Sequence, residues 1–369
     1  MVKIKVNLRK NVDASYEIIV ERGISNKLPA LLKKKFGKRK IVIITDTNAG
    51  KYHGKKLCLK FIKSGFDASV IIFKSGEEQK RLSTIEKIQE KMLKNGVNRT
   101  SVSVLLGGGV VGDVGGFASA TFMRGIDFVQ VPTTLLAMVD SSIGGKTGVD
   151  LQTGKNMSGS FTQPKLVLID IDFLKTLPKK EFSNGISEVV KYGVISDARL
   201  FSYIEKNKGK IRKRDYGCLN EIIKRSCAIK ANIVGKDEHE GNLRKILNYG
   251  HTVGHAIEAA GNYRKYSHGE GISIGMNAEG LISKKLKGMN LHEIERQKKL
   301  LEFFSLPTRM PKIGTGKIVR LMAKDKKSSG GKLAFALPKK IGKMMNVKGR
   351  FGIEVKRKIV ESALKEAGK

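Results

Sequence analysis

The chain has 369 residues, a length that suits two domains and a large buried core. Its content of 40% hydrophobic and 28% charged residues excludes a disordered polypeptide and a bundle of membrane helices. The 71 Lys and Arg residues outnumber the 34 Asp and Glu residues, and the net charge of +37 attracts anions such as phosphorylated metabolites, nucleic acid or acidic membrane surfaces.

The cysteines are few and widely spaced. Cys58, Cys218 and Cys227 form an odd set without a C-x-x-C pair, which argues against a disulfide framework and a zinc ribbon. The first ten residues, MVKIKVNLRK, contain no apolar run long enough for a signal peptide. We therefore expect a reduced, cytoplasmic protein without a membrane partner.

Short β-branched runs alternate with helical patterns up to about residue 178. Strands are predicted at residues 41–45, 69–73, 101–106, 128–131 and 165–170, and a helix at 82–94. This alternation predicts a parallel sheet covered by helices, and hence an α/β domain over residues 1–178.

Helical patterns dominate after residue 178. They cover residues 188–203, 219–234, 251–260, 271–287 and 294–304, followed by a hairpin around Gly330 and Gly331 and a final amphipathic helix. The sequence thus predicts a second, mostly α-helical domain over residues 179–369.

A glycine-rich turn follows the third predicted strand. Residues 107–112 read G-G-G-V-V-G and fit G-x-G-x-x-G, in which glycines let the backbone approach a pyrophosphate and the helix N-terminus supplies free N–H groups. A tight turn that needs small residues gives the same pattern. Asp127 lies where a ribose-binding acid is sought, but it precedes its strand and should lie at the opposite edge of the sheet. Asp46, at the C-terminal end of its strand, is the better ribose partner.

A second polar block combines glycines, hydroxyl residues and lysines over residues 132–134, 140–148 and 154–156. Such residues suit an anion cradle, although an ordinary surface loop has the same composition. Gly145-Lys146-Thr147 ends like a P-loop, but the earlier glycine is missing and position 140 is Asp140. ATP binding is therefore not supported.

Histidines gather in the helical half. His251 and His255 are spaced i, i+4 on one face of a predicted helix, and His268 follows. Three imidazoles, or two with a carboxylate such as Glu188, would form a catalytic zinc site. The spacing fits a structural histidine pair equally well and does not decide which two histidines bind metal, and Glu188 beside Lys191 equally fits a structural ion pair. No H-E-x-x-H motif is present, which disfavours a zincin protease.

Taken together, the motifs resemble the 3-dehydroquinate synthase family over residues 41–342. They are the glycine turn with Asp113, ATFMRG ending at Gly125, PTTLLAMVDSSIGGKTGVD at 132–150, GKNM at 154–157, EVVKYG at 188–193 and LNYGHTVGHAIE at 247–258. The resemblance implies a nucleotide-binding α/β domain followed by an α-helical domain that binds metal and substrate. It also implies a carbon–oxygen lyase of the shikimate pathway that uses NAD and Zn²⁺ or Co²⁺. This enzyme converts 3-deoxy-D-arabino-heptulosonate 7-phosphate into 3-dehydroquinate and phosphate.

Roles follow from the resemblance residue by residue. The implied metal ligands are Glu188, His251 and His268, and the implied catalytic residues are Asp140, Lys191, Glu240 (a proton acceptor) and His255. The implied substrate contacts are Arg124, Lys146, Asn156, Lys230, Arg244, Asn248, Lys326 and Lys327. The expected NAD-binding residues are Asp46, Asn48, Glu77, Lys80, Gly108, Gly109, Val110, Asp113, Thr133, Thr134, Lys155, Phe173 and Thr176. A homodimer is implied, in which Arg124 reaches the neighbouring pocket.

Other functions compete with this interpretation. A sister sugar-phosphate cyclase would act on another sugar phosphate, and we expect only a carboxylate substrate to need both Lys230 and Arg244. A basic nucleic-acid-binding protein on an old enzyme scaffold would explain the charge. However, aromatic residues are only 6% of the chain and no RNA-binding motif appears, so nucleic acid is not expected as a partner. A metal-dependent polyol dehydrogenase would not need the phosphate-binding lysines.

Overall fold

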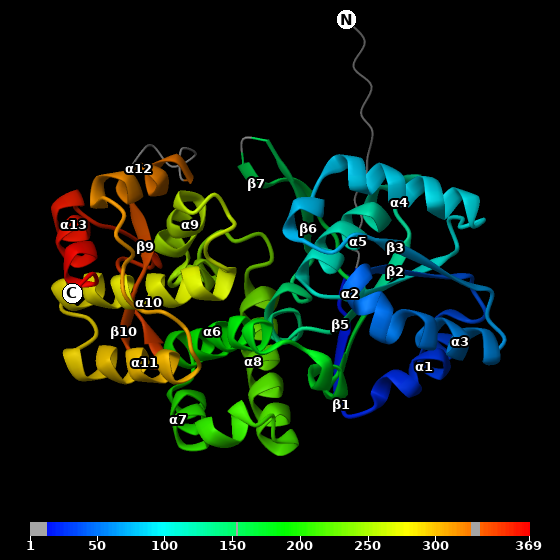
Figure 1. Cartoon of the computed structure of the whole chain (residues 1–369), viewed down its shortest axis with the longest axis horizontal. Coiled ribbons are helices and arrows are strands. Elements are labelled where there is room, and N and C mark those ends of the chain that lie inside the picture. Colours follow the sequence, from blue (N-terminus) through cyan, green and yellow to red (C-terminus); the bar gives the residue numbers. More distant parts are fainter. Residues whose placement is uncertain (1–12, 153, 326–332) are drawn as a thin grey trace, which may run out of the picture.

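The computed structural model describes residues 13–152, 154–325 and 333–369. A sheet with its helices forms one part of the molecule and a group of helices forms the other, with the β6–β7 hairpin between them (Figure 1). The predicted α/β-then-α architecture is confirmed. Within the described ranges, no helix is both long and apolar enough to cross a membrane.

The main sheet has six parallel strands in the order β1-β8-β5-β4-β2-β3. These are β1 (Glu17–Glu21), β2 (Ile41–Asp46), β3 (Ala68–Phe73), β4 (Val102–Gly107), β5 (Asp127–Pro132) and β8 (Leu166–Asp170). All five predicted strands are present. Of the six strands of this sheet, only β1, a half-exposed edge strand, was not predicted from the sequence.

Helices cover both faces of this sheet. They are α1 (Leu28–Phe36), α2 (Thr47–Ala49), α3 (Lys55–Lys63), α4 (Leu82–Lys94) and α5 (Gly109–Thr121). Alternate residues of β2 point to opposite faces: Ile43 belongs to the hydrophobic cluster that contains α1 and α3, and Ile44 to the cluster that contains α4 and α5. Burial on both faces explains why the central strands are continuous apolar runs.

The second glycine-rich block forms an antiparallel hairpin, not the loop that its composition suggests. Its strands are β6 (Lys146–Leu151) and β7 (Gly154–Phe161). A Cβ at Gly148 would lie 2.6 Å from the Ser158 carbonyl oxygen, and one at Gly159 would lie 2.2 Å from that of Thr147. Glycine at both positions lets the two strands approach this closely.

The remaining elements are mostly helical. The helices are α6 (Lys179–Ile195), α7 (Ala198–Arg212), α8 (Tyr216–Lys236), α9 (His251–Ala260), α10 (His268–Lys285), α11 (Leu291–Phe303), α12 (Thr315–Asp325) and α13 (Arg357–Glu366). Shorter turns are η1 (Ile24–Asn26), η2 (Gly50–Gly54), η3 (Glu77–Gln79), η4 (Phe122–Arg124), η5 (Ala137–Ser141), η6 (Ile171–Thr176) and η7 (Leu243–Asn248). Two small antiparallel pairs complete the fold: β9 (Ala334–Ala336) with β12 (Gly352–Glu354), and β10 (Pro338–Lys340) with β11 (Lys343–Met344).

One predicted helix is wrong in extent. The pattern at residues 188–203 covers parts of two helices, because the chain breaks at Ser196 and Asp197. The Asp197 carboxylate accepts hydrogen bonds from the backbone N–H groups of Arg199 and Leu200 and caps α7. The final amphipathic helix is α13, whereas the hairpin expected around Gly330 and Gly331 lies outside the described residues.

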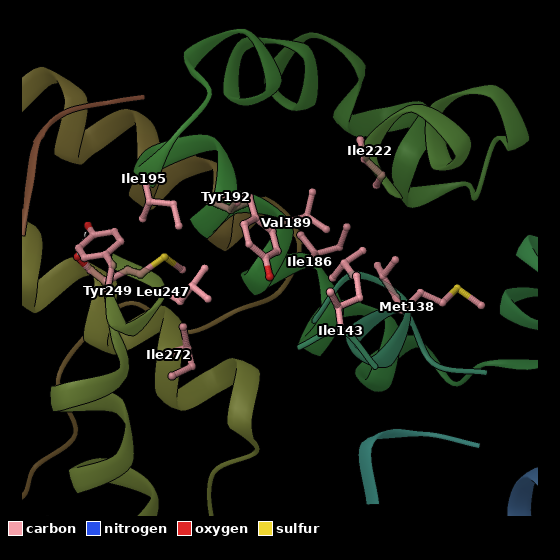
Figure 2. Packing of buried hydrophobic residues seen from close by; sticks show 14 of the residues in the cluster. Met138, Ile143, Ile186, Val189, Tyr192, Ile195, Ile222, Leu247, Tyr249 and Ile272 are labelled. Atoms are coloured by element: carbon pink, nitrogen blue, oxygen red, sulfur yellow. Dashed lines mark hydrogen bonds between the residues drawn. The ribbon is translucent and has the colours of Figure 1, made fainter. Parts of the chain in front are cut away.

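Helix α6 runs through the middle of the core. Figure 2 shows its residues Ile186, Val189 and Tyr192 between Met138 on one side and Leu247 on the other. Every residue from Asn184 to Ile195 is buried. A helix that is enclosed on all sides carries its polar residues into the interior as well, and Glu188 and Lys191 are among them.

Helices α9 and α10 cross at glycines. A Cβ at Gly275 would lie 1.9 Å from the carbonyl oxygen of Gly250, and one at Gly254 would lie 2.9 Å from that of Gly271. Gly250 also has a φ of +82°, which favours glycine. This close approach brings the histidines of α9 next to the start of α10.

The crossing yields a stability prediction. We expect Gly275→Ala to lower the free energy of unfolding by about 3 kcal/mol or more, because the two backbones must separate to admit the methyl group. The matched control is Gly209→Ala in α7, where a Cβ would meet nothing within 4 Å. That change should raise stability by about 0.5–1 kcal/mol. Urea denaturation of both variants checks this, and equal stability of the two would contradict it.

Candidate active site

Glu188, His251 and His268 converge from three helices. The Glu188 Oε1 atom lies 3.5 Å from His251 Nε2 and 3.3 Å from His268 Nε2. One ligand atom from each residue lies within 4.8 Å of the others. Two imidazoles and one carboxylate form the donor set of many catalytic zinc sites. The three residues that the resemblance implies as metal ligands are therefore brought together, and their metal role stays a prediction.

In each histidine, the ring nitrogen that does not face Glu188 contacts an oxygen atom, and this contact orients the ring. His251 Nδ1 lies 3.1 Å from the Tyr249 carbonyl oxygen, and His268 Nδ1 lies 3.2 Å from Glu258 Oε1. A ring that donates through Nδ1 presents Nε2 as its ligand atom, and both Nε2 atoms face Glu188. This chemistry fits a divalent cation.

Local structure fixes where these residues lie. His268 is the first residue of α10 and directly follows the N-cap Ser267, which forms a capping box with Glu270. At the start of α9, the buried Glu279 carboxylate accepts hydrogen bonds from the backbone N–H groups of Gly250, at 2.7 Å, and Val253, at 3.0 Å. A carboxylate at this position satisfies N–H groups that a helix start leaves unpaired.

Burial and neighbouring groups shift the pKa values of the two histidines in opposite directions. Burial, together with the Lys191 ammonium, lowers the pKa of His251 to about 3, so its ring is neutral at pH 7. Burial also disfavours a charged His268, but hydrogen bonds to Glu188 and Glu258 outweigh it and raise its pKa to about 10. Burial opposes ionisation of Glu188, yet Lys191 at 2.5 Å lowers the pKa of that carboxyl to about 2. A divalent cation at His268 would replace a proton held between two carboxylates.

A second buried cluster surrounds Asp140. Lys230 Nζ lies 2.7 Å from both Asp140 Oδ1 and the Asp140 carbonyl oxygen, and the Tyr192 hydroxyl donates to Oδ1 at 2.6 Å. Burial raises the pKa of Asp140, but Lys230 and Lys191 outweigh it and keep the pKa below the usual range. Burial lowers the pKa of Lys230, against the attraction of Asp140. This ion pair therefore joins α8 to η5, the segment that precedes the hairpin.

A third group joins the hairpin to the helical half. Glu240, at a φ of +60°, forms an ion pair with Lys146 and accepts a hydrogen bond from Asn248 Nδ2 at 2.6 Å. The buried Arg244 guanidinium donates to the carbonyl oxygens of Glu238 and, at 3.1 Å, Gly144. These expected substrate and catalytic residues therefore surround one region.

The expected NAD residues line the C-terminal edge of the sheet. From β2 the strand order continues to β3 on one side, and from β4 it continues to β5 and β8 on the other. Open α/β sheets bind ligands at such a switch point, which here lies between β2 and β4. Gly108 caps α5, and a Cβ there would lie 3.0 Å from Thr134 Cγ2; a Cβ at Gly109 would lie 3.2 Å from Ser141 Oγ. Larger residues at these two glycines, which precede Val110, would therefore crowd the side chains of Thr134 and Ser141.

Side chains around this edge are already paired. Lys80 Nζ lies 2.8 Å from Asp113 and 2.5 Å from the Asn156 side-chain oxygen. Lys155 Nζ lies 3.3 Å from Glu77. The remaining expected NAD residues lie at strand ends: Asp46 ends β2 and Asn48 follows it, Thr133 follows β5, and Phe173 and Thr176 lie in η6 after β8. The Asp46 carboxylate caps α2 through the N–H groups of Asn48 and Ala49, so its ribose contact stays a prediction.

Some expected residues are not gathered here. Arg124 is exposed in η4 with a φ of +70°. Lys326 and Lys327 lie outside the described residues. His255, by contrast, is beside the site: its ring centroid lies 5.4 Å from that of His251, and it forms a second group of potential ligands with Glu258 and His268. Asp127 forms an ion pair with Arg39 at the start of β5, and the prediction that it lies at the opposite edge of the sheet is confirmed.

Three buried polar residues of the site were not singled out from the sequence. They are Tyr192, Glu258 and Glu279. Their partners lie 10 to 52 residues away along the chain, beyond the reach of a local pattern. The S-x-x-E spacing at Ser267 and Glu270 is a local signal that could have predicted the start of α10 at His268.

Comparisons with known proteins agree along the chain. The family described as 3-dehydroquinate synthase N-terminal matches residues 70–184, and that described as 3-dehydroquinate synthase C-terminal matches residues 185–328. The chain is 47% identical to a 3-dehydroquinate synthase of Prochlorococcus marinus (strain AS9601), over 89% of this chain and 92% of that one.

Solved structures are similar over nearly the whole length. A 2-epi-5-epi-valiolone synthase of Streptomyces hygroscopicus subsp. jinggangensis 5008, with NAD⁺ and Zn²⁺ bound, has a TM-score of 0.89 at 25% identity over 98% of this chain and 99% of that one. A 2-deoxy-scyllo-inosose synthase with carbaglucose-6-phosphate, NAD⁺ and Co²⁺ has a TM-score of 0.85 at 26% identity over 95% of this chain and 96% of that one. The chain belongs to the 3-dehydroquinate synthase family.

Proposed function

We propose that this protein is a 3-dehydroquinate synthase, a phosphate-eliminating carbon–oxygen lyase that converts 3-deoxy-D-arabino-heptulosonate 7-phosphate into 3-dehydroquinate and phosphate. The observation that carries the proposal is the convergence of Glu188, His251 and His268 beside a lysine-bearing hairpin, in a chain 47% identical to a 3-dehydroquinate synthase. Its place would be the shikimate pathway, which leads to aromatic amino acids.

Two bound groups would supply chemistry that side chains lack. Glu188, His251 and His268 would hold Zn²⁺ or Co²⁺, a Lewis acid that polarises a substrate hydroxyl or carbonyl. The expected NAD-binding residues would hold NAD at the C-terminal edge of the sheet, where it would supply reversible hydride transfer at the C5 carbinol of the substrate. A ketone at C5 would acidify the neighbouring C–H bond and permit elimination of phosphate. Re-reduction, ring opening and closure of an enolate onto a ketone would complete the proposed reaction.

The cations of the site suit a substrate that carries both a phosphate and a carboxylate. Lys146 on the hairpin and Lys230 and Arg244 in the helical half point into one region. In the structure, Glu240 pairs with Lys146 and Asp140 pairs with Lys230. Backbone carbonyl oxygens accept hydrogen bonds from Arg244. A substrate anion would therefore compete with groups already present, which favours strongly charged phosphate and carboxylate groups.

Proton transfers need ionised groups near the substrate. Burial opposes ionisation of Glu240, but hydrogen bonds from Lys146 and Asn248 keep the pKa of its carboxyl below the usual range. Glu240 is thus a base at pH 7, in line with its proposed role as proton acceptor. His255, one helical turn after His251, would contact the phosphate or move a proton there.

The alternative is a sister cyclase that acts on another sugar phosphate. The two structures above carry such names, but they are 25% and 26% identical to this chain, well below the 47% of the curated 3-dehydroquinate synthase. The intact pair Lys230 and Arg244 favours a substrate with a carboxylate. We do not propose a nucleic-acid-binding function.

The proposal includes the assembly and the domains. Arg124 would reach the pocket of a second copy in a homodimer, for which an exposed position after α5 is suitable. The boundary between a nucleotide-binding domain (1–178) and a metal- and substrate-binding domain (179–369) would fall between η6 and α6. A cytoplasmic location is part of the same proposal.

The first prediction concerns turnover. With NAD and Zn²⁺, the chain should release phosphate from 3-deoxy-D-arabino-heptulosonate 7-phosphate, and chelator treatment should abolish this until Zn²⁺ or Co²⁺ is restored. Lys230→Met should lower kcat/KM by about 10- to 100-fold, the effect of losing one hydrogen bond to a charged group. Coupled phosphate detection measures both effects.

The control for this prediction lies on the same helix. Lys224→Met changes an exposed lysine of α8 and should leave kcat/KM unchanged. Phosphate release from a different sugar phosphate only would identify a sister cyclase. No release from any sugar phosphate by the metal- and NAD-loaded chain would refute the proposal.

The second prediction concerns pH. Burial lowers the pKa of Lys230 below 10.5, and its protonated form is the one that binds an anion. Activity should therefore be lost as pH rises through this lowered pKa, and kcat/KM should show an alkaline limb below pH 10.5. Lys230→Arg keeps its charge and should move that limb to higher pH. Identical alkaline limbs in pH profiles of the two proteins would assign the limb to another group.

A further inference from the structure

Glu258, near the end of α9, is a buried carboxylate without a role in the reaction above. Its side chain is 3% exposed. The Oε1 atom lies 3.2 Å from His268 Nδ1, and the Oε2 atom lies 3.2 Å from Lys155 Nζ. The two oxygens therefore contact residues of different function, an expected metal ligand and an expected NAD-binding residue.

The contact with His268 determines which nitrogen faces the metal site. A carboxylate at Nδ1 keeps the proton on that atom and leaves Nε2 for a ligand bond. Nε2 faces Glu188 Oε1 at 3.3 Å. Oxygens that orient metal-binding histidines in this way typically change metal affinity by about 10- to 100-fold.

The contact with Lys155 links the hairpin to α9. Lys155 lies between Glu258 and Glu77 Oε1, and the Tyr263 ring covers its ammonium group at 4.4 Å. Glu258 belongs to α9 and Glu77 to the loop after β3, so this lysine joins the helical half to the edge of the sheet.

The fold leaves room for this carboxylate. A Cβ at Gly271 would lie 3.1 Å from Glu258 Cγ and 3.4 Å from Oε1. A larger residue at position 271 would push Glu258 away from His268. The close approach of α9 and α10 thus places Glu258 as well as the histidines.

We propose that Glu258 is a positioning residue that orients His268 through Oε1 and holds Lys155 beside the cofactor site through Oε2. This inference rests on the metal site of the proposed function. His255, Glu258 and His268 also lie close enough to hold a cation of their own. The Lys155 ammonium on Oε2 opposes a second cation there, which favours a positioning role.

The test compares metal and NAD affinities of the metal-stripped full chain. Zn²⁺ is titrated against a chromophoric chelator, and NAD binding is followed by calorimetry on the Zn²⁺-loaded chain. We expect one Zn²⁺ per wild-type chain and about 10- to 100-fold weaker binding by Glu258→Ala. Glu258→Gln keeps an acceptor for Nδ1–H but loses the charge near Lys155. It should therefore hold Zn²⁺ within a few-fold of wild type and bind NAD several-fold more weakly.

The control is Glu205→Gln, which removes a carboxylate paired with Arg296 outside the site and should change neither affinity. Thermal melting of each variant checks folding, and the isosteric Gln variant decides the question if Glu258→Ala does not fold. Unchanged Zn²⁺ affinity in Glu258→Ala, or unchanged NAD affinity in Glu258→Gln, would overturn the proposal while wild-type turnover stands. Two Zn²⁺ per wild-type chain and one in Glu258→Ala would make Glu258 a ligand. A wild-type chain that binds no Zn²⁺ would overturn both this proposal and the metal site.

Discussion

The buried ion pair between Glu188 and Lys191 is the contact on which the rest of the site depends. The side chains are 0% and 1% exposed, and their charged atoms lie 2.5 Å apart. Each buried charge costs several kcal/mol of desolvation, which only close opposite charges and hydrogen bonds offset. Glu188 and Lys191 both lie on the enclosed helix α6 and pair with each other, and the other ionisable groups that face them come from other elements. His251 and His268 face Glu188, and the positive charge of Lys191 helps to hold Asp140 ionised. Residues of three helices therefore meet around this pair.

Opposite charges continue from this pair to the edge of the sheet. Starting at Lys191, each group contacts the next at 3.9 Å or less, in the order Lys191, Glu188, His268, Glu258, Lys155, Glu77, Lys80 and Asp113. The signs alternate when His268 is protonated, so every ion in the row has oppositely charged neighbours. The proposed metal end and the proposed NAD end are thus parts of one electrostatic system.

Much of the fold could be predicted because its signals are local. β-branched runs buried on both faces of a sheet are recognisable from a few residues, and so is a histidine pair at i, i+4. The β6–β7 hairpin was missed because its Gly and Ser residues have low β propensity and form a strand pair through close backbone approach. The break at Asp197 was missed because a single cap interrupts an otherwise continuous apolar pattern. Spacing left open which histidines pair with Glu188, since His268 lies 80 residues away from it. Only the resemblance named that set, and only the tertiary structure brings in Glu258.

Helix α6 also bears on how the molecule can be divided. The larger hydrophobic cluster runs without interruption from Ile24 to Ala367, and α6 lies in its middle (Figure 2). A Cβ at Gly185 of α6 would lie 2.5 Å from Leu135 Cβ, and one at Gly193 would lie 3.0 Å from Phe201. Both halves of the chain therefore contribute to one apolar interior, although the smaller cluster lies wholly between Val42 and Val149. A cut at residue 178 would expose apolar side chains on both sides of the shared interior. During synthesis, part of the apolar surface of the first half would stay exposed until α6 has left the ribosome. A chimaera that joins the first half of this chain to the second half of a relative would fold only if the residues that pack on both faces of α6 are complementary to it.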